Sequence, residues 1–267
     1  MIRSLYTAGS GLMAQQTAID TIANNLSNVN TTGYKKQRAE FQEALYAYIQ
    51  PAIPTGAPQG LHMGQGVQLA GLQRIVDMGP LNETGNTYDL AVQGDGFFQV
   101  QLADGSVAYT RDGAFKLDGS AGTGGSGPVR LTTANGALVL DDQGQPIMIP
   151  ANGEEVAIGA DGQIHFTTTD AAGSKVEALG PKIGLVSFTN PGGLLALGDN
   201  LLTTSAASGG AIAATGGIKQ GALEGSNVQM VEEMVALIQA QRAYEFSSKA
   251  VQTSDEMLSI ANNLRKG

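Results

Sequence analysis

The sequence predicts an α+β protein in which long helices at both ends of the chain enclose a β-rich, mainly antiparallel middle region. Apolar residues recur every seven positions near the N-terminus, at Leu5, Leu12, Ile19 and Leu26. A second seven-residue repeat lies near the C-terminus, at Met230, Leu237, Tyr244, Val251 and Leu258. The intervening chain is rich in Gly, Thr, Val and Asp-Gly pairs, which favour short strands joined by tight turns.

The first apolar stripe predicts a helix over residues 4–29. Ile22 and Val29 each follow a member of the stripe by three residues, which keeps them on the same helical face. Asn and Gly tolerate left-handed backbone, so their concentration between residues 24 and 33 predicts the end of this helix. At 1.5 Å per residue, the helix would be roughly 40 Å long.

The second stripe predicts a helix over residues 227–264, roughly 57 Å long. Ser226 and Gln229 fit a capping box, in which each side chain satisfies an orphan backbone donor. A further set of small residues repeats every seven positions beside the apolar stripe. These residues are Ala240, Ser247, Ser254 and Ala261. We expect them to let another helix approach closely.

The chain between the first helix and the β-rich region has two parts. Residues 36–49 carry an apolar face and predict either a second short helix or an extended arm. Residues 50–66 hold three prolines and four glycines, which predict irregular backbone. A segment of this length without regular structure is usually functional or disordered. Strand signals begin at residues 67–75.

Asp-Gly pairs divide the middle region into strand-sized segments. Three pairs, at Asp104, Asp112 and Asp118, predict consecutive β-hairpins, and Asp161-Gly162 predicts another turn. Further strands are expected at residues 138–140, 156–158, 164–168 and 183–188. The expected domains are an N-terminal helix (1–35), an extended arm with a Pro- and Gly-rich insert (36–75), a connecting β domain (76–94 and 195–225), an outer β domain (95–194) and a C-terminal helix (226–267).

Charge and cysteine content restrict the function. The net charge is −9, and residues 95–199 alone hold 12 acids against 5 bases. Nucleic-acid binding is disfavoured because phosphate contacts need clustered Lys and Arg. The one basic cluster, Lys35, Lys36 and Arg38, is too short to support such binding. The absence of Cys excludes disulfides, thiolate metal sites and Cys nucleophiles.

Motifs that carry catalysis are missing from the chain. His62 and His165 are far apart in sequence and lie outside any catalytic motif. Gly94-Asp95-Gly96 lacks the further residues of a dinucleotide or phosphate loop and is better explained as a turn before the strand at Phe97. Asp141 and Asp142 lack calcium-loop spacing, so turn chemistry explains them. We therefore expect no enzymatic activity, no metal, no cofactor and no small-molecule substrate.

The apolar stripes have two interpretations. A heptad of apolar residues is most often the core face of an ordinary helix. Here both stripes are long, lie at the chain ends, and have opposite faces rich in Ala, Ser, Thr, Gln and Asn that can pack against further helices. The periodicity favours assembly between subunits, and ordinary core packing remains open at this point.

Several segments, in order along the chain, resemble the signature motifs of the bacterial flagellar rod and hook protein family. The N-terminal motif lies within residues 14–35 and includes the run Ile22-Ala23-Asn24-Asn25-Leu26. The internal motifs are Gly94-Asp95-Gly96-Phe97-Phe98 and Tyr109-Thr110-Arg111-Asp112-Gly113. The C-terminal motifs are residues 225–234 and Gln241-Arg242-Ala243-Tyr244-Glu245. Together they cover both ends and the centre of the chain.

The resemblance implies that the terminal helices pair as an inner coiled coil, with the β-rich body outside them. The implied assembly interface of these helices comprises Leu5, Leu12, Ile19, Ile22, Leu26, Met230, Leu237, Tyr244, Val251 and Leu258. Within the family, the chain length and the segment 46–66 resemble those of distal rod subunits. This segment is implied to stiffen the assembly by wedging between subunits, through Tyr46, Gln50, Pro51, Pro54, Pro58, Gly60 and Leu61.

The implied function is that of a structural subunit, assembling helically into a rigid hollow shaft that transmits torque to the hook and encloses an export channel. The implied partners are further copies of the chain, proximal rod proteins, the hook subunit, surrounding ring proteins and the flagellar type III export apparatus. The N-terminus lacks a sustained apolar region, so we expect export to the periplasm-spanning rod without a cleaved signal peptide. Two alternatives remain, a sister proximal rod or hook-family subunit, and a β-rich peptidoglycan-binding or hydrolysing module.

Overall fold

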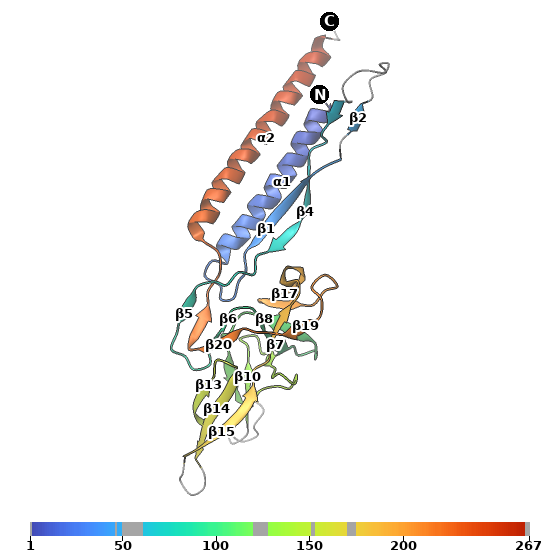
Figure 1. The fold of residues 1–267 in the computed structure, drawn as a ribbon. Helices are drawn as coiled ribbons and strands as arrows, with labels where there is room; N and C mark the ends of the chain where they lie inside the picture. The colour runs from blue at the N-terminus through green and yellow to red at the C-terminus, as the bar shows by residue number, and fades with distance from the viewer. Residues whose placement is uncertain are drawn as a thin grey trace. The chain divides into compact units, whose positions relative to one another are not determined.

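The computed structural model describes residues 2–45, 47–49, 61–119, 128–150, 153–169 and 175–264. The chain divides into two compact units, which we treat separately (Figure 1). The helical unit contains Met1–Ser27, Gln37–Arg74 and Gln229–Gly267, and the β unit contains Asn28–Lys36 and Ile75–Val228. The N- and C-terminal helices flanking a β-rich antiparallel middle agree with the fold class that the sequence predicts.

Two helices of opposite direction lie side by side in the helical unit, α1 (Ile2–Ser27) and α2 (Met230–Leu264) (Figure 1). The predicted capping box is wrong, because α2 begins later than a Ser226 cap requires. The Ser226 hydroxyl instead accepts a hydrogen bond from the Val228 backbone N–H at 3.3 Å. Glu233 N–H donates to the Gln229 carbonyl at 3.1 Å, which places Gln229 at the start of the helical ladder.

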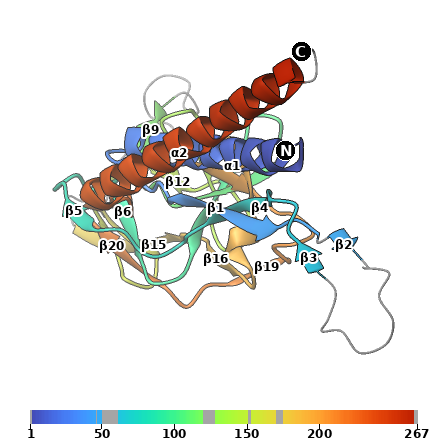
Figure 2. The same ribbon diagram turned by 90° about the horizontal axis from the view of Figure 1, so that it is seen from above.

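A β-ribbon accompanies α1, as Figure 2 shows. Strands β1 (Gln37–Glu43) and β4 (Val67–Arg74) pair antiparallel with an irregularity after Glu40, so the extended arm, and not the second helix, is correct. Beyond it, β2 (Ala47–Ile49) pairs with β3 (Leu61–Met63). Most of the Pro- and Gly-rich insert, residues 46–66, lies outside the described residues. Tyr46, Gln50, Pro51, Pro54, Pro58 and Gly60 lie outside the described residues, and Leu61 is the first residue of β3.

The β unit is built on one large sheet. Its path is β12-β10-β11-β7-β8-β18-β17, while β16 joins β7 to β19 and β9 pairs with β10. The strands are β7 (Phe97–Gln101), β8 (Val107–Thr110), β9 (Lys116–Asp118), β10 (Val129–Thr132), β11 (Leu138–Val139), β12 (Met148–Ile149), β16 (Leu185–Phe188), β17 (Leu195–Gly198), β18 (Leu201–Thr203) and β19 (Ala211–Ala213). A short 3₁₀ turn, η2 (Pro191–Gly193), precedes β17.

Three smaller sheets complete the β unit. They are β13 (Gly153–Ile158) with β14 (Gln163–Thr169) and β15 (Lys175–Lys182), β6 (Leu90–Gln93) with β20 (Gly217–Gln220), and β5 (Leu81–Glu83) with β21 (Ala222–Glu224). Every described pairing is antiparallel. The four strands expected between residues 138 and 188 all form. The division into a connecting and an outer β domain stays a prediction.

The Asp-Gly pairs have different outcomes. Asp104-Gly105 joins the β7–β8 hairpin, and Asp161-Gly162 joins the β13–β14 hairpin, as expected. Asp118 ends β9, whose antiparallel partner is β10. The hairpin predicted at Asp112-Gly113 is wrong, because β9 pairs with β10 and not with β8. Gly113 has another role, since a Cβ atom on it would lie 1.7 Å from the Leu90 carbonyl oxygen.

Adjacent phenylalanines place an aromatic ring in each of two cores. Successive residues of a strand point to opposite faces of the sheet. Phe98 packs in the larger cluster, in edge contact with Phe115 at 5.1 Å between ring centroids. Phe97 packs in the smaller cluster with Phe188, whose ring also contacts Tyr109. The Phe-Phe motif thereby fixes both faces of the central strand β7.

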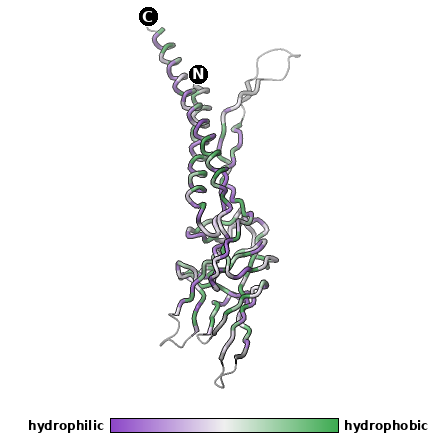
Figure 3. The backbone as a smooth tube through the Cα atoms, turned by 90° about the vertical axis from the view of Figure 1, so that its left-hand side faces the viewer, coloured by the Kyte–Doolittle hydropathy of each residue, from purple (hydrophilic) through white to green (hydrophobic). Residues whose placement is uncertain are grey.

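Hydrophobic residues recur along both helices as well as in the strands, as Figure 3 shows. None of the described helices combines the length and apolar character needed to cross a membrane.

We predict that Gly113→Ala lowers the free energy of unfolding by about 1–3 kcal/mol, because the new methyl group can be accommodated only by moving the backbone at Leu90. Denaturant unfolding followed by circular dichroism measures this. Gly119→Ala is the matched control, since a Cβ atom there meets nothing within 4 Å. Equal stability of the two variants would show that the contact at Gly113 relaxes without cost.

Candidate assembly site and buried polar junction

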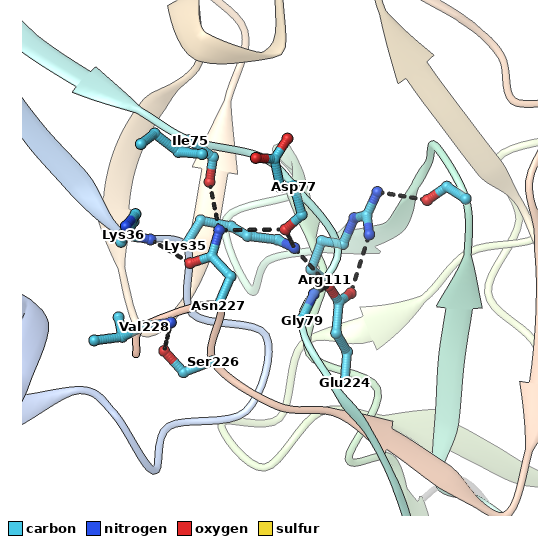
Figure 4. A network of polar contacts seen from close by, with 11 residues as sticks. Lys35, Lys36, Ile75, Asp77, Gly79, Arg111, Glu224, Ser226, Asn227 and Val228 are labelled. Atoms are coloured by element: carbon cyan, nitrogen blue, oxygen red, sulfur yellow. Dashed lines mark hydrogen bonds and ion pairs between the residues drawn. The ribbon is translucent and has the colours of Figure 1, made fainter. Parts of the chain in front are cut away.

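The chain passes between the two units after residues 27, 36, 74 and 228. On the β-unit side, segments next to three of these passages lie together. They are residues 34–36, 75–77 and 224–228, and Figure 4 shows the polar contacts that join them. We call this group the polar junction.

One amide side chain ties three segments of the polar junction together. The Asn227 Oδ1 atom accepts a hydrogen bond from the Lys36 backbone N–H at 2.7 Å. The Nδ2 group of Asn227 donates to the carbonyl oxygens of Ile75 at 2.9 Å and Asp77 at 3.2 Å (Figure 4). Ile75 N–H in turn donates to the Lys36 carbonyl at 2.9 Å. The amide thus uses both its donor and acceptor groups to hold backbone at fixed positions.

A buried carboxylate forms the charged centre of the polar junction. Glu224 is 1% exposed. Its Oε1 atom accepts hydrogen bonds from the Lys35 ammonium at 2.5 Å and the Gly79 backbone N–H at 2.9 Å. Its Oε2 atom accepts from Arg111 Nη1 at 3.0 Å. Both carboxylate oxygens are therefore satisfied, as burial of an ion requires.

The two cations of this centre have further partners. The Lys35 ammonium also donates to the Asp77 carbonyl at 2.7 Å. Arg111 Nη2 donates to the Gly94 carbonyl at 2.8 Å, and its guanidinium carbon lies 5.3 Å from the centre of the Phe97 ring. Burial lowers the pKa of Lys35, while its hydrogen bond to Glu224 and the charge of that carboxylate oppose the shift. Glu224 therefore favours the charged form of Lys35 and opposes the effect of its burial.

A glycine lets the N-terminal segment reach this centre. Gly33 has φ +66°, and a Cβ atom there would lie 2.6 Å from the Asp112 backbone nitrogen. The Gly33 N–H donates to the Glu224 carbonyl at 2.8 Å. The neighbouring Thr32 hydroxyl donates to the Asp112 carboxylate at 2.8 Å. The Asn- and Gly-rich segment that ends the first helix therefore also contacts Asp112 and Glu224 through Thr32 and Gly33.

The polar junction was missed by the sequence analysis. Lys35 and Arg38 were grouped as one basic cluster, but Lys35 is buried, whereas Arg38 is exposed on β1 and pairs with Glu40. One signal was available, because Lys35 and Arg111 both lie inside the motif segments of the family resemblance.

The Asp-rich turns behave as expected. The Asp141 carboxylate, for example, accepts from the backbone N–H groups of Gln143 and Gln145.

Small and polar residues form the closest contact between α1 and α2. The buried positions are Ala14, Thr21 and Asn25 on α1 and Glu233, Ala240 and Ser254 on α2. A Cβ atom on Gly11 would lie 3.7 Å from the Ser247 hydroxyl oxygen, so the backbones approach closely there. The small-residue prediction is confirmed for Ala240, Ser247 and Ser254. Ala261, by contrast, is exposed.

Asn25 joins three elements of the helical unit. Its Nδ2 group donates to the Glu233 carboxylate on α2 at 3.2 Å and to the Gln37 carbonyl on β1 at 2.8 Å. Its Oδ1 atom accepts from the Gln37 backbone N–H at 2.9 Å. At the other end of α1, the Ser10 hydroxyl accepts a hydrogen bond from the backbone N–H of Val67 on β4 at 3.3 Å. The β-ribbon is thus fastened to α1 at both ends.

The apolar stripes predicted as the assembly interface lie beside this contact. Most members are half-buried in the single chain. These are Leu5, Leu12, Ile19, Ile22, Leu26, Leu237, Val251 and Leu258. Met230 and Tyr244 are exposed, at 44% and 37%. A single chain does not test contacts between subunits, so the interface role of all ten residues stays a prediction.

The described residues contain no group of three or more His, Cys, Asp or Glu side chains placed to hold a metal ion. The site is instead one of packing and hydrogen bonding, in which residues far apart in the sequence position helices and backbone segments.

Three family models match separate parts of the chain. They are described as flagella basal body rod protein (residues 5–35), flagellar hook protein FlgE/F/G D1 domain (residues 91–166) and flagellar basal body rod FlgEFG protein C-terminal (residues 219–264). Each matched segment contributes one member of the buried ion cluster, namely Lys35, Arg111 and Glu224. The matched segments therefore meet in the polar junction.

Curated relatives extend the similarity over the whole chain. The flagellar basal-body rod protein FlgG of Borreliella burgdorferi is 44% identical, with 100% of both chains covered. The FlgG proteins of Agrobacterium fabrum and Bacillus subtilis are 40% and 39% identical, over 98% and 100% of this chain and of their own length. Identity at this level along the full length shows that the chain belongs to the flagellar basal-body rod protein family.

Proposed function

We propose that this protein is a structural subunit of the distal part of the flagellar rod. The full-length identity of 39–44% to rod proteins named FlgG in several bacteria is the observation that carries the proposal. The protein is accordingly a component of the flagellar basal body and assembles with other basal-body components. Many copies stack helically into a rigid hollow shaft that transmits torque to the hook and encloses the export channel.

The terminal helices form the inner part of this shaft. The ten predicted interface residues supply its packing, because each keeps apolar surface exposed in the single chain that a neighbouring copy can bury. The partners of the shaft are the proximal rod proteins at one end, the hook subunit at the other, the surrounding rings and the export apparatus. The role is structural and involves no catalysis.

The polar junction supports a mechanical role. The chain has four passages between the helical and β units. Three of these begin at segments that Asn227 and the Lys36–Ile75 backbone pair hold together. Segments held to one another resist independent movement, so the junction keeps the β-unit ends of these three passages in fixed relative positions.

A sister role in the hook–basal body complex is the second candidate. The hook-basal body complex protein FlhP of Bacillus subtilis is 32% identical over 99% of this chain. That identity is lower than the 39% to the FlgG protein of the same organism, which favours the distal rod.

We expect electron microscopy of the concentrated protein to show ordered tubes and Leu237→Asp to abolish them, because the charge would be buried in an apolar contact. Leu179→Asp, at an exposed position on β15, is the control and should assemble like the natural chain. A monomer that never assembles at high concentration would contradict the rod function. Tubes formed by Leu237→Asp would contradict the interface assignment alone.

The insert can be removed with little disturbance to the ribbon that carries it. Glu43 pairs with Val67, so replacing residues 44–66 by Asn-Gly closes β1 and β4 with a favoured two-residue turn. We predict that this variant still assembles but gives bent tubes, because the segment that wedges between subunits is gone. Straight tubes of unchanged stiffness in electron micrographs would contradict a role of the insert in rigidity.

We predict that Glu224→Gln lowers the free energy of unfolding by about 3–5 kcal/mol, because Lys35 and Arg111 lose the carboxylate with which both form buried ion pairs. Denaturant unfolding measures the loss. Glu83→Gln, which breaks the exposed pair with Lys219, is the control and should change stability little. A similarly small change for Glu224→Gln would show that the buried cluster does not stabilise the fold.

A further inference from the structure

Helix α2 carries a second apolar stripe that the seven-residue repeat does not reveal. Its members are exposed by between 48% and 79%. They are Val231, Val235, Ile238, Phe246, Met257, Ile260 and Leu264. Several of them are related by steps of 11 residues, a period close to that of a straight helix, so the stripe keeps to one side of α2. At 100° per residue, this outer face lies roughly 145° from the buried position Ala240 and roughly 105° from Ser254.

Two cations interrupt the outer face of α2. Arg242 and Lys249 occupy positions of the same 11-residue pattern and are exposed. Neither takes part in an ion pair with another described residue. From its C-terminal end, the outer face therefore presents the apolar residues Leu264, Ile260 and Met257, and then the charge of Lys249.

Helix α1 also has an exposed face on which apolar residues are followed by a charged residue, as on the outer face of α2. Tyr6 and Met13 are 75% and 74% exposed, and Asp20 follows at the same seven-residue spacing. The Asp20 carboxylate accepts a hydrogen bond from Gln16 of its own helix at 3.0 Å, and it remains exposed. From its N-terminal end, α1 presents two apolar residues and then an acid. This order complements the outer face of α2 when the helices run in opposite directions.

The helix lengths favour the same alignment. α1 has 26 residues and α2 has 35. Within one chain Gly11 lies opposite Ser247, so the last turns of α2 extend beyond the start of α1, as Figure 1 shows. Ala261 is exposed for this reason. Placing Asp20 opposite Lys249 moves α1 by 11 residues toward the C-terminal end of α2 and covers these last turns.

We propose that the outer face of α2 binds the outer face of α1 from a second copy of the chain, antiparallel, with Asp20 of one copy opposite Lys249 of the other. This inference rests on the proposed rod function and specifies the contact between its subunits. The same alignment brings Met13 to within one residue of Met257 and Tyr6 to within one residue of Leu264. Apolar residues then meet apolar residues, and the one acid of the α1 face meets a cation.

Charge also disfavours other alignments. With Asp20 opposite Arg242, Lys249 would be buried against Met13, which leaves a charge without a partner. Glu245 and Glu256 border the stripe four residues before and seven residues after Lys249. Moving Asp20 toward either acid would bring like charges together. The alignment with Lys249 pairs the one acid of α1 with a cation, brings the apolar positions together, and places Arg242 opposite Ser27 at the end of α1.

Disulfide trapping tests the alignment directly, because the natural chain has no Cys. We expect the variant carrying Met13→Cys and Met257→Cys to form covalent multimers when assembled and mildly oxidised, seen as a ladder on non-reducing gels. The matched control carries Met13→Cys and Val235→Cys, which places the second thiol on the same face but 22 residues away. A ladder from the control and none from the first pair would overturn the proposal.

Charge reversal tests the ion pair. We expect Lys249→Glu and Asp20→Lys each to raise the critical concentration for assembly roughly tenfold, and the double variant to restore it. Lys116→Glu, at an exposed position on β9, makes the same charge change and should assemble normally. Failure of the natural chain to assemble would refute the rod function. Normal assembly of both single reversals, with no trapped multimers, would refute the proposed contact alone.

Discussion

The fold depends on a single desolvated carboxylate. Glu224 is buried on β21, and a buried anion is tolerated only with nearby compensating charge and hydrogen bonds. Its partners come from distant parts of the sequence, Lys35 after the first helix and Arg111 after β8. The carboxylate is satisfied only when the N-terminal segment, the central sheet and the C-terminal strand are all in place. Correct assembly of these three regions is thereby coupled to one group.

The packing of the two helices differs from that of the β unit. Small residues form the contact between α1 and α2, and large apolar residues remain exposed on their outer faces. Ala240 and Ser254 allow the backbones to approach but bury little apolar area. Phe246 on α2 and Met13 on α1 remain exposed on the outer faces. Such a pair gains modest stability from its own contact and much more from neighbours. This arrangement suits a subunit whose helices are completed by other copies.

Local patterns in the sequence were sufficient for the helices, most strands and several turns, because these depend on residues close in sequence. Longer-range features were not accessible in this way. In the sequence Lys35 is simply one member of a short basic cluster, and nothing nearby indicates its burial, because its carboxylate partner Glu224 is 189 residues away. The hairpin at Asp112 failed because the partner of β9 is set by the sheet and not by the turn. The outer stripe of α2 was missed because its period is 11 residues, not seven.

In the polar junction, the charged side chains around Glu224 and the neutral amide of Asn227 have different roles. The Glu224 cluster neutralises its own buried charges, and its two cations each also donate to one backbone carbonyl, at Asp77 and Gly94. Asn227 is neutral and short, and it binds three backbone groups directly, at Lys36, Ile75 and Asp77. Both groups lie next to the passages of the chain into the helical unit. Together they fix the β-unit ends of these passages relative to one another, which is the physical basis for the mechanical role we propose.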